Sequence, residues 1–268
     1  MMGNNIRQPK YLFIDGGQIR DHFVNGMREW DPSVTHLDID FSELIRNTGA
    51  VKSFYYDCQD QQQLPDEYFS EIRKISGSHV RIGTLKGKSN KREPRQKEVD
   101  ILLAVDMMNH SMRRNMGEAI LLTGDMDFLP VVETLIEMGC FVTVMADKKH
   151  VASDLKDAAD EFREITFKDY YSWSSPRIKS KGRLPDLQYP QLTPDQQGYS
   201  WLKQGKCNDI AIDLYHMEAR GNYLPTFYIY PKDYSPYSRS PQLIYQYHDL
   251  ERLELFFRLQ FGGIEWEE

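Results

Sequence analysis

Cysteine is scarce in this sequence, and long hydrophobic runs are absent. The three cysteines, Cys58, Cys140 and Cys207, lie far apart and match neither a zinc-binding spacing nor a disulfide framework. No apolar run approaches the roughly 18 residues that a membrane-spanning helix needs. The N-terminal segment MMGNNIRQPK lacks the apolar core of a signal peptide. We therefore expect a cytoplasmic protein, in a reducing compartment, with no membrane partner.

Several motifs of known chemistry are also missing. The sequence has no Gly-rich phosphate loop of the Walker type and no G-x-G-x-x-G dinucleotide motif, and its seven histidines show no metal-ligand spacing. The net charge of -7 excludes a surface that is basic all over but allows a local basic groove. Hydrophobic residues make up 40% of the 268 residues, enough for a core. We expect one large domain, or a main domain with a smaller one.

The stretch 119–146 has the clearest pattern. A short apolar run, 119–122, is followed by the loop Thr-Gly-Asp-Met-Asp. Residues 128–138 then place apolar side chains at helical spacing, and 140–145 is a second apolar, β-branched run. This strand–loop–helix–strand order is typical of parallel sheets whose two faces are covered by helices.

The rest of the first two-thirds repeats this alternation. We expect strands at 11–14, 51–56, 79–85 and 162–167, and helices at 18–30, 40–46, 65–75, 98–116, 151–159 and 168–173. The helix at 98–116 is expected to be buried, because it carries Val99, Leu102, Leu103, Val105, Met107 and Met108. The pattern predicts an α/β fold, with a doubly wound parallel sheet of five or six strands flanked by helices.

The composition changes near residue 174. Residues 174–183 are rich in Ser, Lys and Arg and are expected to form a linker between a domain at 8–173 and a module at 184–268. In the module we expect a helix at 208–218, a strand at 226–230, and a helix or strand–helix pair at 243–260. The module is too apolar to be disordered, which indicates a small α+β extension. Its role is not indicated by any motif, and a homo-oligomer or protein partner could use it.

Carboxylates stand where the predicted elements end. Asp15 follows the first strand, Asp125 and Asp127 follow the central strand, and Asp100 lies near the start of the long helix. Because ligands of open α/β sheets bind at the carboxyl ends of the strands, these four acids are candidate metal ligands and catalytic residues. Oxygen ligands without His or Cys favour Mg²⁺ or Mn²⁺, with a metal-bound water as nucleophile. Asp106 ranks lower, since six helical positions turn it about 120° away from Asp100.

Simpler roles compete with this interpretation. Asp127 fits the preference for a helix N-cap, and Pro130 in the first turn agrees with that. Lys97 could pair with Asp100 one turn later. Thr123 could orient a phosphate or a water, or make only a structural hydrogen bond. The joint placement of several acids at one sheet edge is what favours a metal site.

A basic segment precedes the long helix. Residues 86–97 read KGKSNKREPRQK, with a single acid. Such segments are often only solvated, but cations next to an acidic centre suit a polyanion whose backbone must reach the metal. The candidate nucleic-acid-binding residues are Lys86, Lys88, Lys91, Arg92, Arg95 and Lys97.

Four stretches resemble the NYN domain, the PIN-like nuclease family that includes the LabA-like proteins. They are FIDGGQIR at 13–20, QKEVDILLAVDMM at 96–108, LLTGDMDFLPVV at 121–132 and GCFVTVM at 139–145. The resemblance covers about residues 8–173. It implies a Rossmann-like parallel sheet and metal-dependent ribonuclease activity, and it places Asp15, Asp100, Asp125 and Asp127 on the acidic active-site positions.

One residue departs from the family's pattern. The first motif commonly has an Asn three residues after its Asp, where this sequence has Gln18. The leading hypothesis is a metal-dependent endoribonuclease that hydrolyses RNA phosphodiester bonds, with Gln18, Thr123 and Asp106 as supporting residues. The alternative is a regulatory NYN module that binds RNA or protein with weak or lost catalysis. The sequence does not separate RNA from DNA as the substrate.

Overall fold

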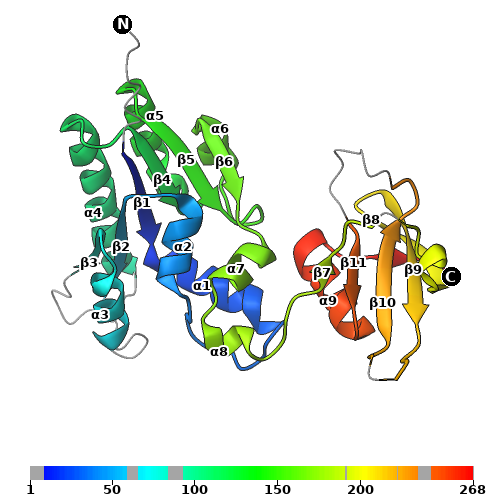
Figure 1. Ribbon diagram of the computed structural model, residues 1–268. Helices are drawn as coiled ribbons and strands as arrows, with labels where there is room; N and C mark the ends of the chain where they lie inside the picture. The colour runs from blue at the N-terminus through cyan, green and yellow to red at the C-terminus, as the bar shows by residue number, and fades with distance from the viewer. Residues whose placement is uncertain are drawn as a thin grey trace, which may run out of the picture. The chain divides into compact units, whose positions relative to one another are not determined.

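The computed structural model describes residues 9–58, 66–83, 93–190, 192–221, 223–234 and 243–267, without the side chains of 66, 67 and 93–97. The chain divides into two compact units, residues 1–178 and 179–268 (Figure 1). The predicted boundary at 174–183 stays a prediction. At this place the structure has a short helix, α8 (Pro176–Lys179), and it buries Ser174 and Ile178 within the first unit.

The first unit is a six-stranded parallel sheet with the strand order β3-β2-β1-β4-β5-β6. This confirms the predicted α/β class. The strands are β1 (Lys10–Asp15), β2 (Lys52–Cys58), β3 (Ser78–Gly83), β4 (Glu118–Leu122), β5 (Phe141–Ala146) and β6 (Glu161–Glu164). The helices are α1 (Gly16–Arg28), α2 (Phe41–Thr48), α3 (Asp66–Lys74), α4 (Glu93–Met112), α5 (Leu129–Glu137), α6 (Ser153–Ala158) and α7 (Phe167–Trp173), with the 3-10 helix η1 (Met126–Phe128) before α5.

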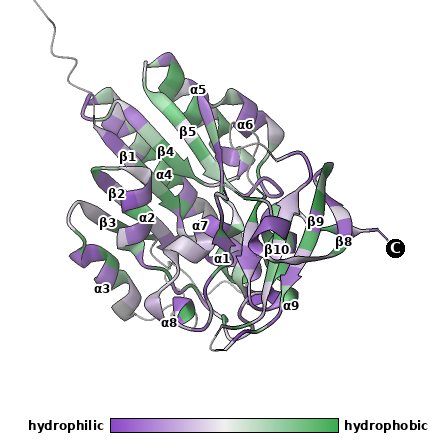
Figure 2. Ribbon diagram, turned by 45° about the vertical axis from the view of Figure 1, so that its right-hand side comes forward, coloured by the Kyte–Doolittle hydropathy of each residue, from purple (hydrophilic) through white to green (hydrophobic). Residues whose placement is uncertain are grey.

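The alternation of side chains along the strands separates the two faces of the sheet. On one face, Tyr11, Phe13, Phe54 and Tyr56 pack in a core with residues of α4, α5 and α6, such as Leu103. On the other face, Tyr55 meets the aromatic rings of Phe41 in α2 and of Tyr68 and Phe69 in α3. Figure 2 shows β4 and β5 as largely hydrophobic ribbons, as expected for strands that are covered on both faces.

The strand order reverses between β1 and β4. From β1 the chain moves outward to β2 and β3, and it then returns through α4 to pair β4 with the free side of β1. The loops that leave β1 and β4 therefore run to opposite faces of the sheet. In open α/β sheets a crevice forms at such a point, at the carboxyl ends of the strands.

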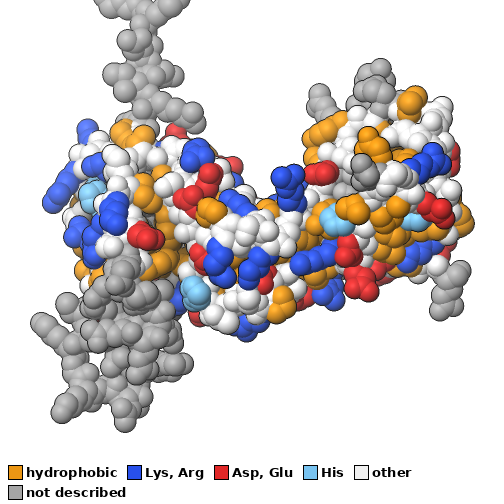
Figure 3. Space-filling view, turned by 60° about the horizontal axis from the view of Figure 1, so that its bottom comes forward, with side chains coloured by type: hydrophobic (Ala, Val, Ile, Leu, Met, Phe, Trp, Pro, Cys, Tyr) orange, Lys and Arg blue, Asp and Glu red, His pale blue; other side chains and the backbone are white. Residues whose placement is uncertain are grey.

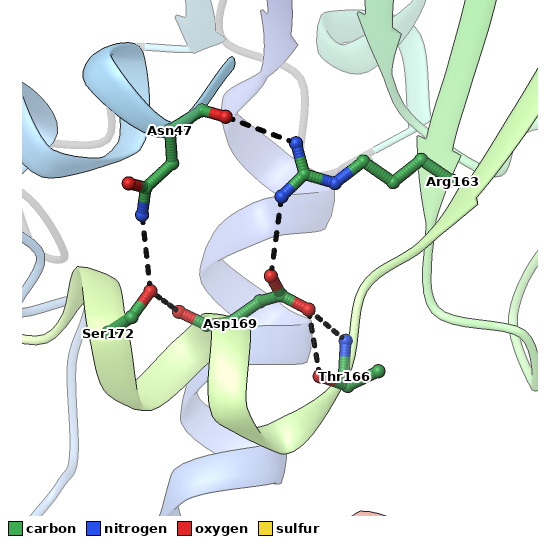
Figure 4. Close-up of polar contacts among 5 residues, drawn as sticks. All are labelled: Asn47, Arg163, Thr166, Asp169 and Ser172. Carbon is green, nitrogen blue, oxygen red and sulfur yellow. Dashed lines mark hydrogen bonds and ion pairs between the residues drawn. The ribbon is translucent and has the colours of Figure 1, made fainter. Parts of the chain in front are cut away.

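A network of polar contacts fixes the end of the first unit (Figure 4). Thr166 caps α7, and the Asp169 carboxylate accepts hydrogen bonds from the Thr166 backbone N–H at 2.9 Å and from its hydroxyl at 2.8 Å. Arg163 of β6 reaches both Asp169 and the backbone oxygen of Asn47 in α2. The Asn47 amide donates in turn to Ser172. The network therefore joins β6 and α7, which follow each other in the sequence, to the distant helix α2.

The prediction that the long helix is buried is wrong for one side of it. Val99, Leu103 and Met107 of α4 are buried as expected, whereas Leu102 is 41% and Val105 49% exposed. The reason is geometric: these two residues lie on the side of the helix that faces away from the sheet. An apolar composition does not show by itself how much of a helix has a partner.

The second unit is an antiparallel sheet with one longer helix, which confirms the predicted α+β extension. Its strand order is β12-β8-β9-β10-β11-β7. The strands are β7 (Asp186–Leu187), β8 (Ser200–Cys207), β9 (Ile210–Met217), β10 (Thr226–Pro231), β11 (Tyr245–Tyr247) and β12 (Glu265–Trp266). The helical elements are the 3-10 helix η2 (Asp195–Gln197) and α9 (Leu250–Phe261), which packs Phe256 and Phe257 against Tyr245 of β11.

The helix predicted at 208–218 is wrong, since residues 210–217 form strand β9. Asn208 and Asp209 both have positive φ angles, 46° and 63°, and make the two-residue turn of a hairpin with β8. Beyond the turn Ile212 and Leu214 are buried, two positions apart, with the less buried Asp213 between them. This period of two is the strand period. No described helix is long and apolar enough to cross a membrane.

Candidate active site

Asp15 stands at the carboxyl end of β1, where the strand order reverses. Its side chain is only 6% exposed. One carboxylate oxygen accepts a hydrogen bond from the Gln18 backbone N–H at 3.1 Å, so Asp15 is also the N-cap of α1. Burial raises the pKa of Asp15 to about 6, with the nearby charges of Asp57 and Asp125 adding to the rise and the two hydrogen bonds of the carboxylate opposing it. The site therefore makes the charged form of Asp15 costly.

Thr123 and Gly124 connect the end of β4 to Asp15 and α1. The Thr123 hydroxyl donates to the second carboxylate oxygen of Asp15 at 3.0 Å. The side-chain oxygen of Gln18 accepts a hydrogen bond from the Gly124 backbone N–H at 2.7 Å. Thr123 is fully buried and thus has a structural contact, one of the two roles expected from the sequence. Gln18 supports the loop that carries Asp125.

Asp125, rather than Asp127, is the cap of the helical turn after β4. The Asp125 carboxylate accepts a hydrogen bond from the Asp127 backbone N–H at 2.9 Å and caps η1. The interpretation of Asp127 as the N-cap is therefore wrong, because η1 begins two residues before the expected position. The Asp127 side chain is exposed. Asp125 is half-buried and close enough to raise the pKa of Asp15.

The two remaining acids lie on α4. Asp106 accepts hydrogen bonds from the Tyr56 hydroxyl at 3.0 Å and from the Arg81 guanidinium at 3.1 Å. These contacts join α4 to β2 and β3, so Asp106 makes structural hydrogen bonds between these elements. Asp100 is half-buried in the first half of α4, one residue after Val99, which packs in the core. Its assignment as a metal ligand stays a prediction.

Asp57 is a site residue that the sequence analysis missed. It ends β2, next to β1, and is 3% exposed. Its carboxylate accepts hydrogen bonds from Arg20 at 2.7 Å, from the Tyr55 hydroxyl at 2.9 Å and from the Cys58 backbone N–H at 2.7 Å. Asp57 therefore has a countercharge, whereas Asp15 has none among its contacts with the side chains that the structure describes. The available signal was its position: like Asp15, it directly follows an apolar strand.

The donor atoms of this edge suit a hard divalent cation. Asp15 and Asp125 supply carboxylate oxygens from adjacent strands, and Thr123 supplies a hydroxyl. All of these donor atoms are oxygens, without sulfur or imidazole nitrogen, and such a set fits Mg²⁺ or Mn²⁺. Within the described residues, no group of three or more His, Cys, Asp or Glu side chains is placed to hold a metal ion. Mg²⁺ commonly uses one or two carboxylates together with waters and substrate phosphates. Two acidic side chains from the protein are therefore enough for such a site.

The predicted basic segment lies outside the residues whose side chains are described, from Lys86 to Lys97. In the described part of the first unit, Arg20 and Arg28 of α1 line a groove of 630 Å³ together with Thr35 and His36. Figure 3 shows Lys and Arg side chains next to Asp and Glu on the visible surface of each unit. The described surface in that view is thus of mixed charge.

The six-stranded parallel sheet flanked by helices is consistent with an NYN, PIN-like fold. The NYN domain matches residues 13–166, more than half of the 268 residues. The chain belongs to the NYN domain family, whose members are typically nucleases, and the resemblance seen in the sequence is confirmed.

Among the solved structures that are similar to this chain is a protein of unknown function from Vibrio parahaemolyticus. It is 18% identical, with a TM-score of 0.47, and the similarity covers 63% of this chain and 97% of that one. Comparison with curated proteins finds no match.

Proposed function

We propose that this protein is a metal-dependent endoribonuclease whose reaction centre is the edge formed by Asp15, Thr123 and Asp125. The observation that carries the proposal is the state of Asp15. A buried carboxylate with two acidic neighbours and no countercharge among the described side chains that it contacts is costly, and a bound cation would relieve that cost. The family supports a nuclease, and RNA is the substrate on which NYN nucleases act.

In this proposal each residue has a limited task. Asp15 and Asp125 hold Mg²⁺ or Mn²⁺, which when bound supplies a more acidic water and stabilises charge on phosphate oxygens. Thr123 fixes the Asp15 carboxylate, and Gln18 fixes the loop at Gly124. Asp100 and Asp127 are proposed as further acids that contact the metal or its waters. Asp106 holds α4 in place through Tyr56 and Arg81.

The approach of the RNA is proposed to use two basic regions. One is the segment of Lys86, Lys88, Lys91, Arg92, Arg95 and Lys97, which directly precedes Asp100 in the sequence. The other is the groove beside α1, which Arg28 lines and which runs along the helix that starts at the acidic edge. Phosphate contacts of this kind supply affinity without sequence preference.

A second candidate function is a binding module with weak or lost catalysis. It is favoured by the finding that the described residues include no group of three or more His, Cys, Asp or Glu side chains placed to hold a metal ion. Such a module would hold RNA or a protein partner. The second unit exposes apolar side chains that suit contact with a partner, among them Tyr189, Trp201, Tyr223 and Leu224. A role for this unit in oligomer formation stays a prediction, as does a cytoplasmic location.

The two functions are separated by a cleavage assay. Labelled single-stranded RNA, structured RNA and single-stranded DNA are incubated with the full chain in Mg²⁺, in Mn²⁺ and in EDTA. Asp125→Asn is the test variant, and Asp154→Asn, an exposed acid on α6, is the matched control. Metal-dependent cleavage of RNA that is lost only in Asp125→Asn supports the nuclease. Binding without cleavage in all three proteins supports the module.

A further inference from the structure

The rings of two histidines lie face to face in the first unit, although their positions in the sequence match no metal-ligand spacing. His22 is in α1 and His150 is in the loop after β5, and their ring centroids are 4.4 Å apart with an angle of 25° between the planes. The His150 side chain is 52% exposed, and its Nδ1 atom faces the Asp147 carboxylate at 3.6 Å. The other ring nitrogen of His150 is therefore left for a ligand. His22 is half-buried.

The pair lies beside the acidic edge because helix α1, the loop after β4 and the loop after β5 are packed together there. His22 is one helical turn after Gln18, whose side chain accepts a hydrogen bond from Gly124. Gly124 also accepts a hydrogen bond from the Ala152 backbone N–H, at 3.1 Å. A Cβ atom on Gly124 would stand 2.4 Å from the His150 backbone oxygen. Gly124, next to Thr123 and Asp125, is thus in direct contact with the His150 loop.

The surroundings of the pair oppose a charge on His22. Burial lowers the pKa of His22, and the neighbouring His150 lowers it further, while Asp147 and Asp21 oppose the shift. The other charged or titratable groups near the pair are Lys148 and Lys149 in the same loop, and Tyr170 of α7, which is close to Asp147. Two stacked imidazoles repel each other when both are charged, so an approaching anion would stabilise one charged ring.

We propose that His22 and His150 form a phosphate subsite that holds the RNA backbone next to the acidic edge and binds most tightly when the pair carries a proton. The inference rests on the proposed function, because the ligand is the substrate of that reaction. An imidazolium donates a charge-assisted hydrogen bond to a phosphate oxygen. This gives a cationic contact on the α1 side of the edge that carries Asp15 and Asp125. The pair positions the substrate and takes no part in bond breaking.

The test measures RNA binding without cleavage. Binding of a labelled single-stranded RNA to the full chain is followed by fluorescence anisotropy in EDTA, at about pH 5.5 and about pH 8, the range in which histidine changes charge. We expect the Kd of the wild type to rise about tenfold between the two pH values, as for loss of one charge-assisted contact. The slope of log K against log salt should also be smaller by about 0.7 at the higher pH, which corresponds to one phosphate contact.

His22→Gln and His150→Gln test the pair, and His79→Gln is the matched control. His79 is also an exposed histidine with a lowered pKa and a stacked ring, but it is in the first half of β3, at the other end of the sheet. The Kd of the two test variants should change less between the two pH values than the Kd of the wild type, whereas the control should behave as the wild type. Asp15 is present in all four proteins, so its own titration cancels in the comparison.

Variants that keep the pH dependence and salt slopes of the wild type would overturn the subsite. Cleavage by the same variants would still support the nuclease, so the two failures can be told apart. A wild type that neither binds nor cleaves RNA would overturn both proposals. Histidine NMR signals give a readout that needs no variant: the pKa values of His22 and His150 should rise on addition of the RNA in EDTA. Unchanged values with bound RNA would contradict the proposal.

Discussion

The side chain of Gln18 links α1 to the loop after β4: its oxygen accepts a hydrogen bond from the Gly124 backbone N–H at 2.7 Å. Gln18 stands where the family commonly has Asn, and the contact explains what the longer side chain does here. Gln18→Asn shortens the side chain by one methylene and leaves the Gly124 N–H without its acceptor. We expect a loss of about 1 kcal/mol in the free energy of unfolding, measured by urea denaturation. An unchanged stability would show that the loop does not depend on this contact.

Asp15 should make the stability of the metal-free protein depend on pH. Its pKa is about 6 in the folded chain and 3.8 ordinarily, so its contribution is fully present below pH 3.8 and is lost as the pH rises through 6. Asp15→Asn removes this dependence. The variant should be more stable than the wild type above pH 6, by between about 1 and 3 kcal/mol, with little difference near pH 4.

Unfolding in EDTA at several pH values measures this effect. Asp154→Asn, an exposed acid, serves as the control that should follow the wild type at every pH. Added Mg²⁺ should stabilise the wild type above pH 6 and should not stabilise Asp15→Asn. A wild type that gains stability between pH 4 and 6 relative to the variant would contradict the account of Asp15.

Arg20 and Asp57 form a buried ion pair, and the loss of Arg20 should cost more unfolding free energy than the loss of the Asp57 charge. Asp57 is almost fully buried, with 2% of its side chain exposed, whereas 20% of the Arg20 side chain is exposed. Arg20→Met leaves a buried carboxylate without its cation, which costs about 3–5 kcal/mol. Asp57→Asn leaves an arginine that can reach water, so its cost should be smaller. A double-mutant cycle by denaturant unfolding checks this, and equal costs for the two single variants would contradict it.

The cap of α7 should contribute measurably to the stability of the first unit. Asp169→Ala removes the acceptor of both Thr166 hydrogen bonds and of Arg163. The expected loss is about 1–2 kcal/mol of unfolding free energy. Asp154→Ala, in the first turn of α6, is the control, because the α6 cap has no side-chain hydrogen bond. Equal losses in the two variants would show that the network of Figure 4 has no special role.

Much of the site could be predicted because it depends on where strands end. Asp15 and Asp125 follow apolar runs, and a parallel sheet brings the ends of adjacent strands to one edge. The same rule applies to Asp57, which was overlooked because its role depends on Arg20, 37 positions away in the sequence. The stacking of His22 on His150 has no local signal at all. It results from the packing of two loops against α1.

The incorrect predictions for α4 and for residues 208–218 have a similar cause. The apolar residues of α4 gave no indication of which side would face the sheet, so Leu102 and Val105 were expected to be buried. In the second unit, a short aliphatic stretch was interpreted as a helix although Asn208 and Asp209 form a hairpin turn. Local pattern identifies a segment well when it is long and periodic, and less well when the partner strand decides its conformation.

The most direct test of the central claim is the rate of RNA cleavage as a function of Mg²⁺ concentration, for the wild type, Asp15→Asn, Asp125→Asn and Asp154→Asn. The substrate is a single-stranded RNA, compared with the same RNA carrying a 2′-deoxy nucleotide at the cleaved position. We expect saturable, metal-dependent cleavage of both substrates by the wild type and Asp154→Asn, and a loss of at least about a hundredfold in the other two variants. Cleavage that persists in EDTA, needs the 2′-hydroxyl and survives Asp125→Asn would contradict the account.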